Sequence, residues 1–376
     1  MMKFILHIAE DLTNEIDVKA KSKEEFELKD VFGKYSLDSV ASSAFGINPE
    51  SFTNKKSKFV AYAADINKGD MFFSSSQMLR LIPGFSQLMS DLNIATLKPK
   101  ATKFFRDVIL QTIRTRKVNK EKKNDMVDLM LDCLKDDTPE KENNEESEVN
   151  EAMKLPSSNT KLDEFSIVAT AYDFIDASYD TTSVTLSYLS YEMAKNPDIQ
   201  KRLQEEIDQA FEESKPEFPD YNTIQNLPFL DMVIHETLRL HPPAGINFRA
   251  VTKDYNLPGT NIILKTNDMV SWNASSVQSD PEHWAHPTDF YPEHFSKEEK
   301  ANRSPYAFQA FGQGPRACIG MRFALLNAKV AVLSVLRRFS FTPGTKTEEP
   351  LHLDPDDALG WVKGGLWVRV EHREDS

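Results

Sequence analysis

The chain has 376 residues, of which 40% are hydrophobic and 27% are charged. These proportions are typical of a folded protein with a sizeable core and exclude an intrinsically disordered chain. The formal net charge is −13, and basic and aromatic residues do not interleave, so we expect no nucleic-acid partner. Cys133 and Cys318 are too few for a disulfide framework and too far apart for a C-x-x-C metal pair.

The first third of the chain is predicted to be mainly helical. Residues 1–16 form an amphipathic pattern, and residues 97–121 and 124–137 carry apolar residues at spacings of three and four. Residues 136–151 then hold eight acids and one lysine. We interpret 136–159 as a flexible acidic connector, because it has almost nothing apolar to bury. No run of eighteen apolar residues is present, so the sequence predicts no transmembrane helix within these 376 residues.

A helix of about 35 residues is predicted from about 160 to Asn196, and at 1.5 Å per residue it would be about 50 Å long. Further helices are predicted over 197–211 and 228–240 and from Cys318 to about 338, and strands over 261–264, 268–274 and 365–370. Helices and strands are interleaved along the chain. The sequence therefore predicts a single domain over 1–376, mainly α with small antiparallel β-sheets.

The segment "AFGQGPRACIGMRFA" (310–324) contains a G-x-G-x-x-[G/A] pattern that starts at Gly312. In a dinucleotide-binding turn this pattern follows a buried strand, and an acid stands about twenty residues further on. Here the preceding residues make a poor strand, and Arg337 and Arg338 stand where the acid is required. We therefore reject a dinucleotide site.

The segment "HETLRLH" (235–241) begins like a zinc-binding H-E-x-x-H motif, but Arg239 occupies the position of the second histidine. A guanidinium cannot ligate zinc, so that hypothesis is rejected. Glu236 and Arg239 are three residues apart and can pair on one helical face. In the long helix, Asp180 and Thr181 form a polar centre that requires partners or a cavity.

Cys318 comes just before a predicted helix and just after glycines, where backbone N–H groups can stabilise a thiolate. Such a thiolate can act as a nucleophile, although no histidine is near in sequence to serve as its base. It can also be an axial ligand of haem iron. Residues 303–346 hold seven Lys/Arg and no acid. They predict either an ordinary basic surface or, around Arg322, Lys329 and Arg337, a docking site for an acidic partner.

Three motifs resemble those of the cytochrome P-450 family of haem-thiolate monooxygenases, in particular the animal microsomal type, and they follow one another along the chain in the family's order. "FGQGPRACIG" matches F-x-x-G-x-R-x-C-x-G, "ETLR" matches E-x-x-R, and "ASYDTT" is similar to [A/G]-G-x-[D/E]-T-[T/S] of the oxygen-binding helix. The resemblance runs from about Glu25 to the end of the chain. It implies the P-450 fold without its N-terminal portion, and thus an N-terminally incomplete chain that lacks the membrane anchor.

The resemblance implies the following roles. Haem b is the cofactor, Cys318 is its axial iron ligand, Asp180 and Thr181 deliver protons, and Glu236, Arg239 and His294 hold the core. Further cofactor-binding residues are Arg316, Arg249, Phe311, Gly312 and Gly320, and the residues facing substrate are Ala177, Ala244, Gly245 and Ile246.

By the same resemblance, the enzyme inserts one oxygen atom from O2 into an apolar xenobiotic, fatty acid or steroid. Its electrons come from NADPH through a flavoprotein reductase, with a small haem electron carrier as a second candidate donor. Its location is the cytoplasmic face of the endoplasmic reticulum membrane, to which only the missing anchor would attach it.

Two alternatives stay open: a non-catalytic fragment unable to retain haem, and an oxygen-independent rearrangement enzyme, against which the Asp180–Thr181 pair argues. The sequence also departs from the family pattern. His294 in "YPEHF" replaces the usual arginine, which makes the network with Glu236 weaker or sensitive to pH. Ser178 stands where the family has glycine, and Asp173 and Asp176 add carboxylates to a stretch that is normally apolar.

Overall fold

The computed structural model describes residues 2–54, 57–66, 99–133, 163–214, 218–355, 357 and 359–373. The predicted connector 136–159 lies outside these residues. The described part is mostly helical with small antiparallel sheets, which confirms the predicted fold class. Its α-helices are α1 Met2–Ser22, α2 Leu28–Phe45, α3 Lys58–Ile66, α6 Pro99–Asn119, α7 Met126–Cys133, α8 Glu164–Lys195, α9 Pro197–Glu213, α10 Tyr221–Gln225, α11 Pro228–Leu240, α12 Ala274–Gln278, α13 Lys297–Asn302 and α14 Met321–Leu336.

The strands of the described residues form three small sheets. In the first, β7 (Trp367–His372) pairs antiparallel with both β1 (Phe26–Glu27) and β6 (Phe339–Pro343). In the second, β2 (Ile246–Ala250) pairs with β5 (Met269–Asn273). In the third, β3 (Tyr255–Asn256) pairs with β4 (Ile263–Leu264). Short 3₁₀ turns are η2 Pro292–Phe295, η3 Pro305–Ala307 and η4 Gly314–Arg316.

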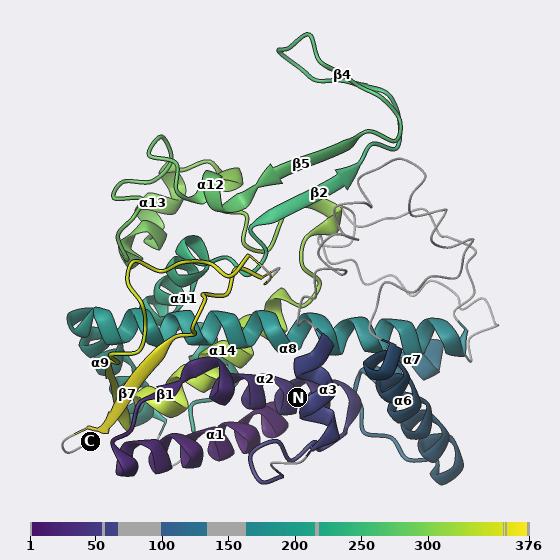
Figure 1. The fold of residues 1–376 in the computed structure, drawn as a ribbon, viewed down its shortest axis with the longest axis vertical. Helices are drawn as coiled ribbons and strands as arrows, with labels where there is room; N and C mark the ends of the chain where they lie inside the picture. The colour runs from purple at the N-terminus through teal and green to yellow at the C-terminus, as the bar shows by residue number, and fades with distance from the viewer. Residues whose placement is uncertain are drawn as a thin grey trace.

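Helix α8 crosses the whole body, with α1 and α2 on one side and β2, β5 and α12 on the other (Figure 1). The Asp163 carboxylate caps its N-terminus by accepting from the Ser166 N–H at 2.7 Å. The helix ends at Lys195, because Asn196 leaves helical geometry and Pro197 opens α9. The predicted long helix is thus confirmed.

Two hydrophobic clusters meet along α8. Residues Ile167–Ile175 of the helix belong to a cluster with α3, α6, α7 and the second half of α2. Residues from Val184 onward belong to a larger cluster with α1, α9, α11, α14 and the first sheet. The polar residues 178–183 lie between the two clusters, where their hydroxyl groups and carboxylate do not have to be packed against aliphatic side chains.

Four elements differ from the sequence-based expectation. Strands 261–264 and 268–274 are separated by a short turn, yet each pairs with an earlier strand, β3 or β2, instead of with the other. Helix α2 was not identified individually, because its residues are buried almost all around and show little helical periodicity. Strand β6 was missed because it follows α14 without a turn-forming residue.

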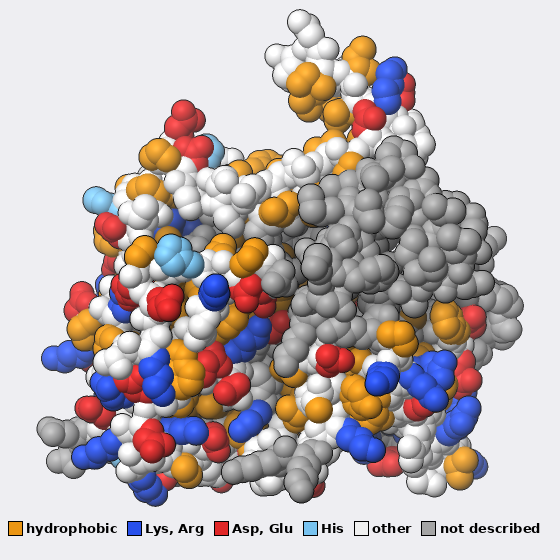
Figure 2. Space-filling view, in the orientation of Figure 1, with side chains coloured by type: hydrophobic (Ala, Val, Ile, Leu, Met, Phe, Trp, Pro, Cys, Tyr) orange, Lys and Arg blue, Asp and Glu red, His pale blue; other side chains and the backbone are white. Residues whose placement is uncertain are grey.

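The hairpin that contains β3 and β4 projects from the body and is the uppermost segment in Figure 1. Tyr255, Ile262 and Ile263 in this hairpin are about half exposed. Figure 2 shows hydrophobic side chains mixed with charged ones on the projection. The apolar side chains contribute little to the core, since the hairpin touches it only through its base.

A buried ion-pair cluster joins α2, α6 and α7. The Arg116 guanidinium donates to both oxygens of Asp125, at 2.5 and 2.6 Å, to Asp128 at 3.0 Å, and to the Phe45 carbonyl at 2.7 Å. All three charged side chains are less than 10% exposed. Gly46 has φ +57°, and a Cβ there would lie 2.7 Å from an Arg116 nitrogen, so the glycine lets the guanidinium close on the end of α2.

We expect Arg116→Met to lower the free energy of unfolding by about 3–5 kcal/mol, because it leaves two buried carboxylates without a cation. Urea unfolding measures this loss. Lys117→Met is the matched control, since Lys117 pairs with Glu164 with both side chains about half exposed. Its loss should be below about 1 kcal/mol, and equal losses in the two variants would contradict the assignment.

Candidate functional site

The loop before α14 presents the Cys318 thiol. Gly312 and Gly314 have φ of +66° and +73°, which a side chain would disfavour, and they let the chain fold back on itself. The fold-back is closed by the Cys318 N–H, which donates to the Phe311 carbonyl at 2.8 Å. Gly320 is the N-cap of α14, so the thiol lies close to a helix N-terminus. Cys318 is unpaired and exposed.

The thiol lies in the wall of a cavity of about 280 Å³. The cavity is bounded by α8, α11, the segment that leads into β2, the Cys318 loop and α14. Its lining residues are Ala177, Thr181, Thr182, Thr185, Ile234, Leu238, Pro243, Ala244, Asn247, Ala310, Phe311, Gly312, Arg316, Cys318, Ala324, Leu325 and Ala328.

The lining is mostly apolar, and two of its three threonine hydroxyl groups are already engaged. Thr181 Oγ1 donates to the Ala177 carbonyl at 2.6 Å, and Thr185 Oγ1 donates to the Thr181 carbonyl at 2.8 Å. Such bonds to the preceding turn satisfy the hydroxyl inside the helix. Among the described residues, Arg316 is the only charged side chain of the lining. The cavity therefore suits an apolar ligand that carries negative charge at its edge.

The structure brings together seven of the predicted site residues in this one lining: Ala177, Thr181, Ala244, Phe311, Gly312, Arg316 and Cys318. The other five predicted cofactor, catalytic and substrate residues lie outside it. Gly320 is next to the thiol, since a Cβ added at this glycine would lie 3.9 Å from Cys318 Sγ. Gly245 lies against Ser275, and Ile246 is 58% exposed on β2. The remaining two are Arg249 and Asp180.

Arg249 lies on β2, where it donates to the Phe248 carbonyl and its guanidinium lies 5.1 Å from the Trp272 ring centre. Neither partner is an acid, so the guanidinium keeps its charge available. Its predicted role toward haem carboxylates stays a prediction.

Asp180 faces a second cavity on the other side of α8, because each residue turns a helix by about 100°. This cavity of about 760 Å³ is lined by α1, α2, α3, α8 and the C-terminal loop. Lys29 Nζ lies 2.9 Å from Asp180 Oδ1 and 3.6 Å from Asp357 Oδ2. Asp357 is itself held by the N–H groups of Leu359 and Trp361. The predicted pair Asp180–Thr181 therefore spans the helix, with one member in each cavity.

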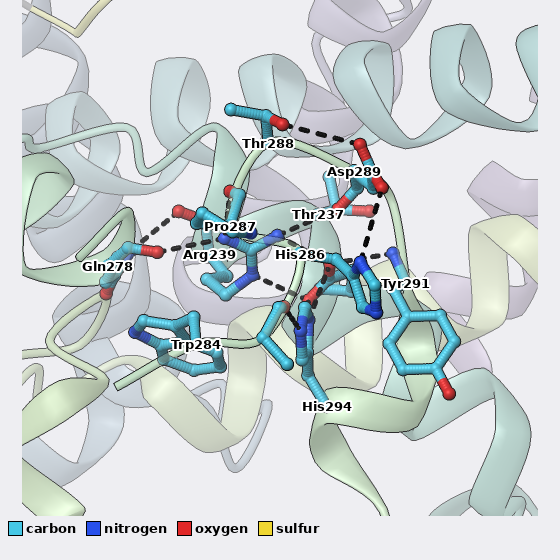
Figure 3. A network of polar contacts seen from close by, with 12 residues as sticks. Thr237, Arg239, Gln278, Trp284, His286, Pro287, Thr288, Asp289, Tyr291 and His294 are labelled. Carbon is cyan, nitrogen blue, oxygen red and sulfur yellow. Dashed lines mark hydrogen bonds and ion pairs between the residues drawn. The ribbon is translucent and has the colours of Figure 1, made fainter. Parts of the chain in front are cut away.

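Glu236 and Arg239 are fully buried and form a bidentate pair at 2.7 and 2.8 Å. Arg239 also donates to the carbonyls of Gln278, Pro287 and Asp289, at 2.8–2.9 Å. Figure 3 shows this cluster. Burial alone would raise the pKa of Glu236, but hydrogen bonds from Arg239 and His294 lower it below its ordinary value. His294 thus contacts Glu236. The role of Glu236, Arg239 and His294 in holding the core stays a prediction.

The cavity around Cys318 fits a haem group. Its single thiol can ligate the iron, its apolar walls suit the macrocycle, and Arg316 can pair with a carboxylate of the cofactor. No carboxylate lines the cavity within the described ranges, so nothing there opposes a thiolate or an anionic edge. In the same described part of the chain, no group of three or more metal-ligating side chains offers an alternative metal site.

Comparison with known proteins identifies the class. The chain matches the family model of cytochrome P450 over residues 1–365 and belongs to that family. It is 36% identical to cytochrome P450 3A2 of Rattus norvegicus over 354 residues, which cover 94% of this chain and 66% of the rat protein. It is also 38% identical to cytochrome P450 9e2 of Blattella germanica over 349 residues, 92% of this chain and 64% of the cockroach protein. The chain thus spans slightly less than two thirds of these relatives.

Sequence reasoning missed several residues of the two cavities and of the buried cluster. Ala324, Leu325 and Ala328 could have been found, because their spacing places them on one face of α14 toward the cysteine. Lys29 and Asp357 could not, because nothing local connects residues so far apart in sequence. Gln278, which bonds to the end of α11, gives no signal because α12 has only five residues, too few to show a helical period.

One surface prediction is wrong in part. Lys329 was expected on a basic face, but it is 1% exposed and pairs with Asp231 at 3.2 Å. Arg337 is exposed and lies 3.9 Å from the Phe211 ring centre. Arg322 is exposed at the start of α14. A lysine in the middle of a mostly apolar helix can be buried when a carboxylate of a neighbouring helix neutralises it.

Glu27, which lines the larger cavity, should make the stability of the protein depend on pH. Burial raises the pKa of its carboxyl group from 4.5 to about 7, and its Oε1 is buried without a hydrogen bond to any described residue. Between these pH values the folded state binds more protons than the unfolded state, so the free energy of unfolding falls as pH rises. Glu27→Gln removes this slope and keeps an oxygen for the Asp30 N–H. Between pH 4.5 and 7.5 we expect the free energy of unfolding of the variant, relative to that of the wild type, to rise by about 2 kcal/mol.

Denaturant unfolding at several pH values checks this gain. Glu25→Gln is the control, because hydrogen bonds from Thr345, together with the charge of Arg369, lower the pKa of Glu25. Its carboxylate therefore stabilises the fold above its ordinary pKa, and that contribution is lost as the pH falls. The control should be destabilised at neutral pH, and a parallel pH dependence of the two variants would refute the prediction.

Proposed function

We propose that this chain holds haem b through Cys318 and works as a haem-thiolate monooxygenase of the cytochrome P450 type. In the proposed reaction, one oxygen atom of O2 is inserted into an apolar small molecule such as a xenobiotic, a fatty acid or a steroid. NADPH supplies the electrons through a reductase. The observation that carries the proposal is one unpaired thiol in an apolar cavity whose described lining has a single charge, that of Arg316.

When bound, haem supplies the activation of O2. The chain's own residues then have three tasks. The Cys318 sulfur would hold the iron, from a position just before the N-terminus of α14. Arg316 and Arg249 pair with the cofactor's carboxylates. Phe311, Gly312 and Gly320 shape the loop so that the thiol reaches the cavity. Gly312 has a positive φ, which would be strained in a residue with a side chain.

Thr181 and Asp180 are the proposed proton donors. Thr181 Oγ1 is on the cavity side of α8 and can give its proton to a ligand in place of the Ala177 carbonyl. Asp180 is on the opposite side, where its Oδ1 lies 2.9 Å from Lys29 Nζ beside the larger cavity. A proton from that side would have to pass around the helix to reach Thr181. The path is short, because Asp180 and Thr181 are adjacent in sequence.

The proposed substrate contacts are Ala177 and Ala244 in the cavity wall, with Gly245 and Ile246 just beyond it at the start of β2. Small side chains at 177 and 244 leave room beside the cofactor. Ile246 offers an exposed apolar surface that a hydrophobic substrate can cover. This arrangement favours an apolar substrate class without selecting one member of it.

The proposed partner is a flavoprotein NADPH reductase, with a small haem electron carrier as a second candidate. The exposed Arg322 and Arg337 supply positive charge for an acidic partner. We propose the cytoplasmic face of the endoplasmic reticulum membrane as the location, by analogy with animal members of the family. None of the helices within the described ranges is long and apolar enough to cross a membrane.

The ligand assignment is tested with Cys318→Ser. Titration of the 376-residue chain with haemin should saturate at one haem per chain. After reduction and exposure to carbon monoxide, the complex should show the red-shifted absorption band of thiolate ligation. Cys318→Ser should lose this band, because a serine hydroxyl does not replace the thiolate.

Cys133→Ser is the matched control and should keep the band. If Cys318→Ser also keeps it, the ligand assignment is wrong. If the wild-type chain fails to bind haemin tightly, the alternative of a fragment unable to retain haem holds instead. Substrate turnover that consumes neither O2 nor NADPH would favour the oxygen-independent rearrangement.

A further inference from the structure

His294 replaces an arginine of the family pattern and is held between two acceptors. The side chain is 2% exposed, in η2. Its Nδ1 lies 3.1 and 3.2 Å from the two oxygens of Glu236. Its Nε2 contacts the Ala285 carbonyl oxygen from the other side. Figure 3 shows the ring beneath the Arg239 side chain.

A neutral imidazole cannot satisfy both contacts. It has one N–H and one lone pair, so one of its nitrogens would turn a lone pair toward an oxygen that also accepts. The choice of tautomer does not remove this conflict, because a carboxylate and a carbonyl are both acceptors. Only the imidazolium, with an N–H on each nitrogen, donates to Glu236 and to Ala285 together.

Of the three charged groups around the ring, Glu236 favours that proton, and Arg239 and Arg303 oppose it. Glu236 is the carboxylate in contact with the ring, and it already pairs with Arg239. Arg303 donates to the His294 carbonyl at 2.9 Å, and its guanidinium lies 3.7 Å from the Trp284 ring centre. The Tyr291 ring lies 5.1 Å from the imidazole. The single carboxylate of Glu236 is thus shared by two arginines and the imidazolium. There is no surplus of negative charge at the ring, so its proton is held by the two hydrogen bonds.

A continuous chain of hydrogen bonds leads from this site to the Cys318 loop. Glu236 orients Arg239, and Arg239 donates to the Gln278 carbonyl. The Gln278 side chain accepts from the Gln309 N–H at 2.7 Å, and the Gln309 carbonyl accepts from the Gly312 N–H at 2.9 Å. Gly312 lines the cavity beside the thiol.

We propose that His294 is a positioning residue that works as an imidazolium, and that loss of its ring proton loosens the Glu236–Arg239 cluster and with it the Cys318 loop. A permanent arginine cation at this position cannot respond to pH, whereas a histidine can. The proposal concerns the chain with or without haem. Its failure is therefore separate from failure of the proposed function.

Unfolding measured between pH 5.5 and 8.5 tests the proposal in three chains: wild type, His294→Arg and His294→Gln. An unfolded histidine loses its proton near about pH 6.5. The wild-type contribution is therefore complete at low pH and is lost as the pH rises. We expect the melting temperature of His294→Arg minus that of the wild type to grow by about 3 °C across this range.

His294→Gln gives an independent comparison, which also serves if His294→Arg does not fold. Glutamine is neutral at every pH, so the wild type should be the more stable of the two at pH 5.5, and the difference should shrink toward pH 8.5. The other seven histidines are present in all three chains and cancel in the differences. Differences that stay constant with pH would overturn the proposal.

A local measurement separates positioning from general stability. After correction for intrinsic rates, amide exchange in residues 309–320 should accelerate several-fold in the wild type between pH 6 and 8, and remain unchanged in His294→Arg. Residues 113–119, around the Arg116 ion pairs, are the internal control and should show no such difference. Equal acceleration in both segments, or none in 309–320, would refute the link from His294 to the loop.

Discussion

The Glu236–Arg239 pair imposes the strictest constraint on this structure, because two ionised groups with no solvent exposure must satisfy every hydrogen bond inside the protein. Arg239 meets it by donating to the carbonyl of Gln278, the last residue of α12, and to those of Pro287 and Asp289 in the segment between α12 and η2. That segment has almost no regular secondary structure. Its conformation is set instead by the need to point backbone oxygens at one guanidinium, and the polypeptide then enters the Cys318 loop in a defined direction.

Helix α8 solves a different problem, the placement of polar groups within a long buried helix. Its aliphatic parts belong to two separate hydrophobic clusters, and the polar residues lie where one cluster gives way to the other. The Thr181 and Ser183 hydroxyl groups bond within their own helix, and Asp180 pairs with Lys29. The helix can therefore separate an apolar cavity from a polar one, and residues adjacent in sequence contribute to opposite sides.

Much of this could be predicted from the sequence, because it depends on local patterns. The long helix, the start of α9 at Pro197 and the i, i+3 pairing of Glu236 with Arg239 follow from periodicity, proline chemistry and helix geometry. The loop around Cys318 followed from its glycines and its family motif. Seven predicted residues meet in one cavity, and their individual roles remain predictions, as does the extent of the domain.

The missed features share a cause, which is that their partners are distant in sequence. The Lys29–Asp357 contact, the contacts of Gln278 and the inward turn of Lys329 depend on how helices are placed against one another. Helix α2 was missed for a related reason. A helix buried on nearly all sides loses the amphipathic signal by which a surface helix is found.

The first sheet has a consequence for the order in which the protein forms. β1 and β7 pair residues 26–27 with 367–368, and Glu25 contacts Arg369, 344 positions further along the chain. Closing so long a loop is entropically costly, and contacts of this kind form slowly. During synthesis, residues 26–27 cannot form this pairing until residues 367–368 have been made. Helices α1 and α2, which flank β1 in the chain, therefore precede in synthesis the strand that completes their sheet.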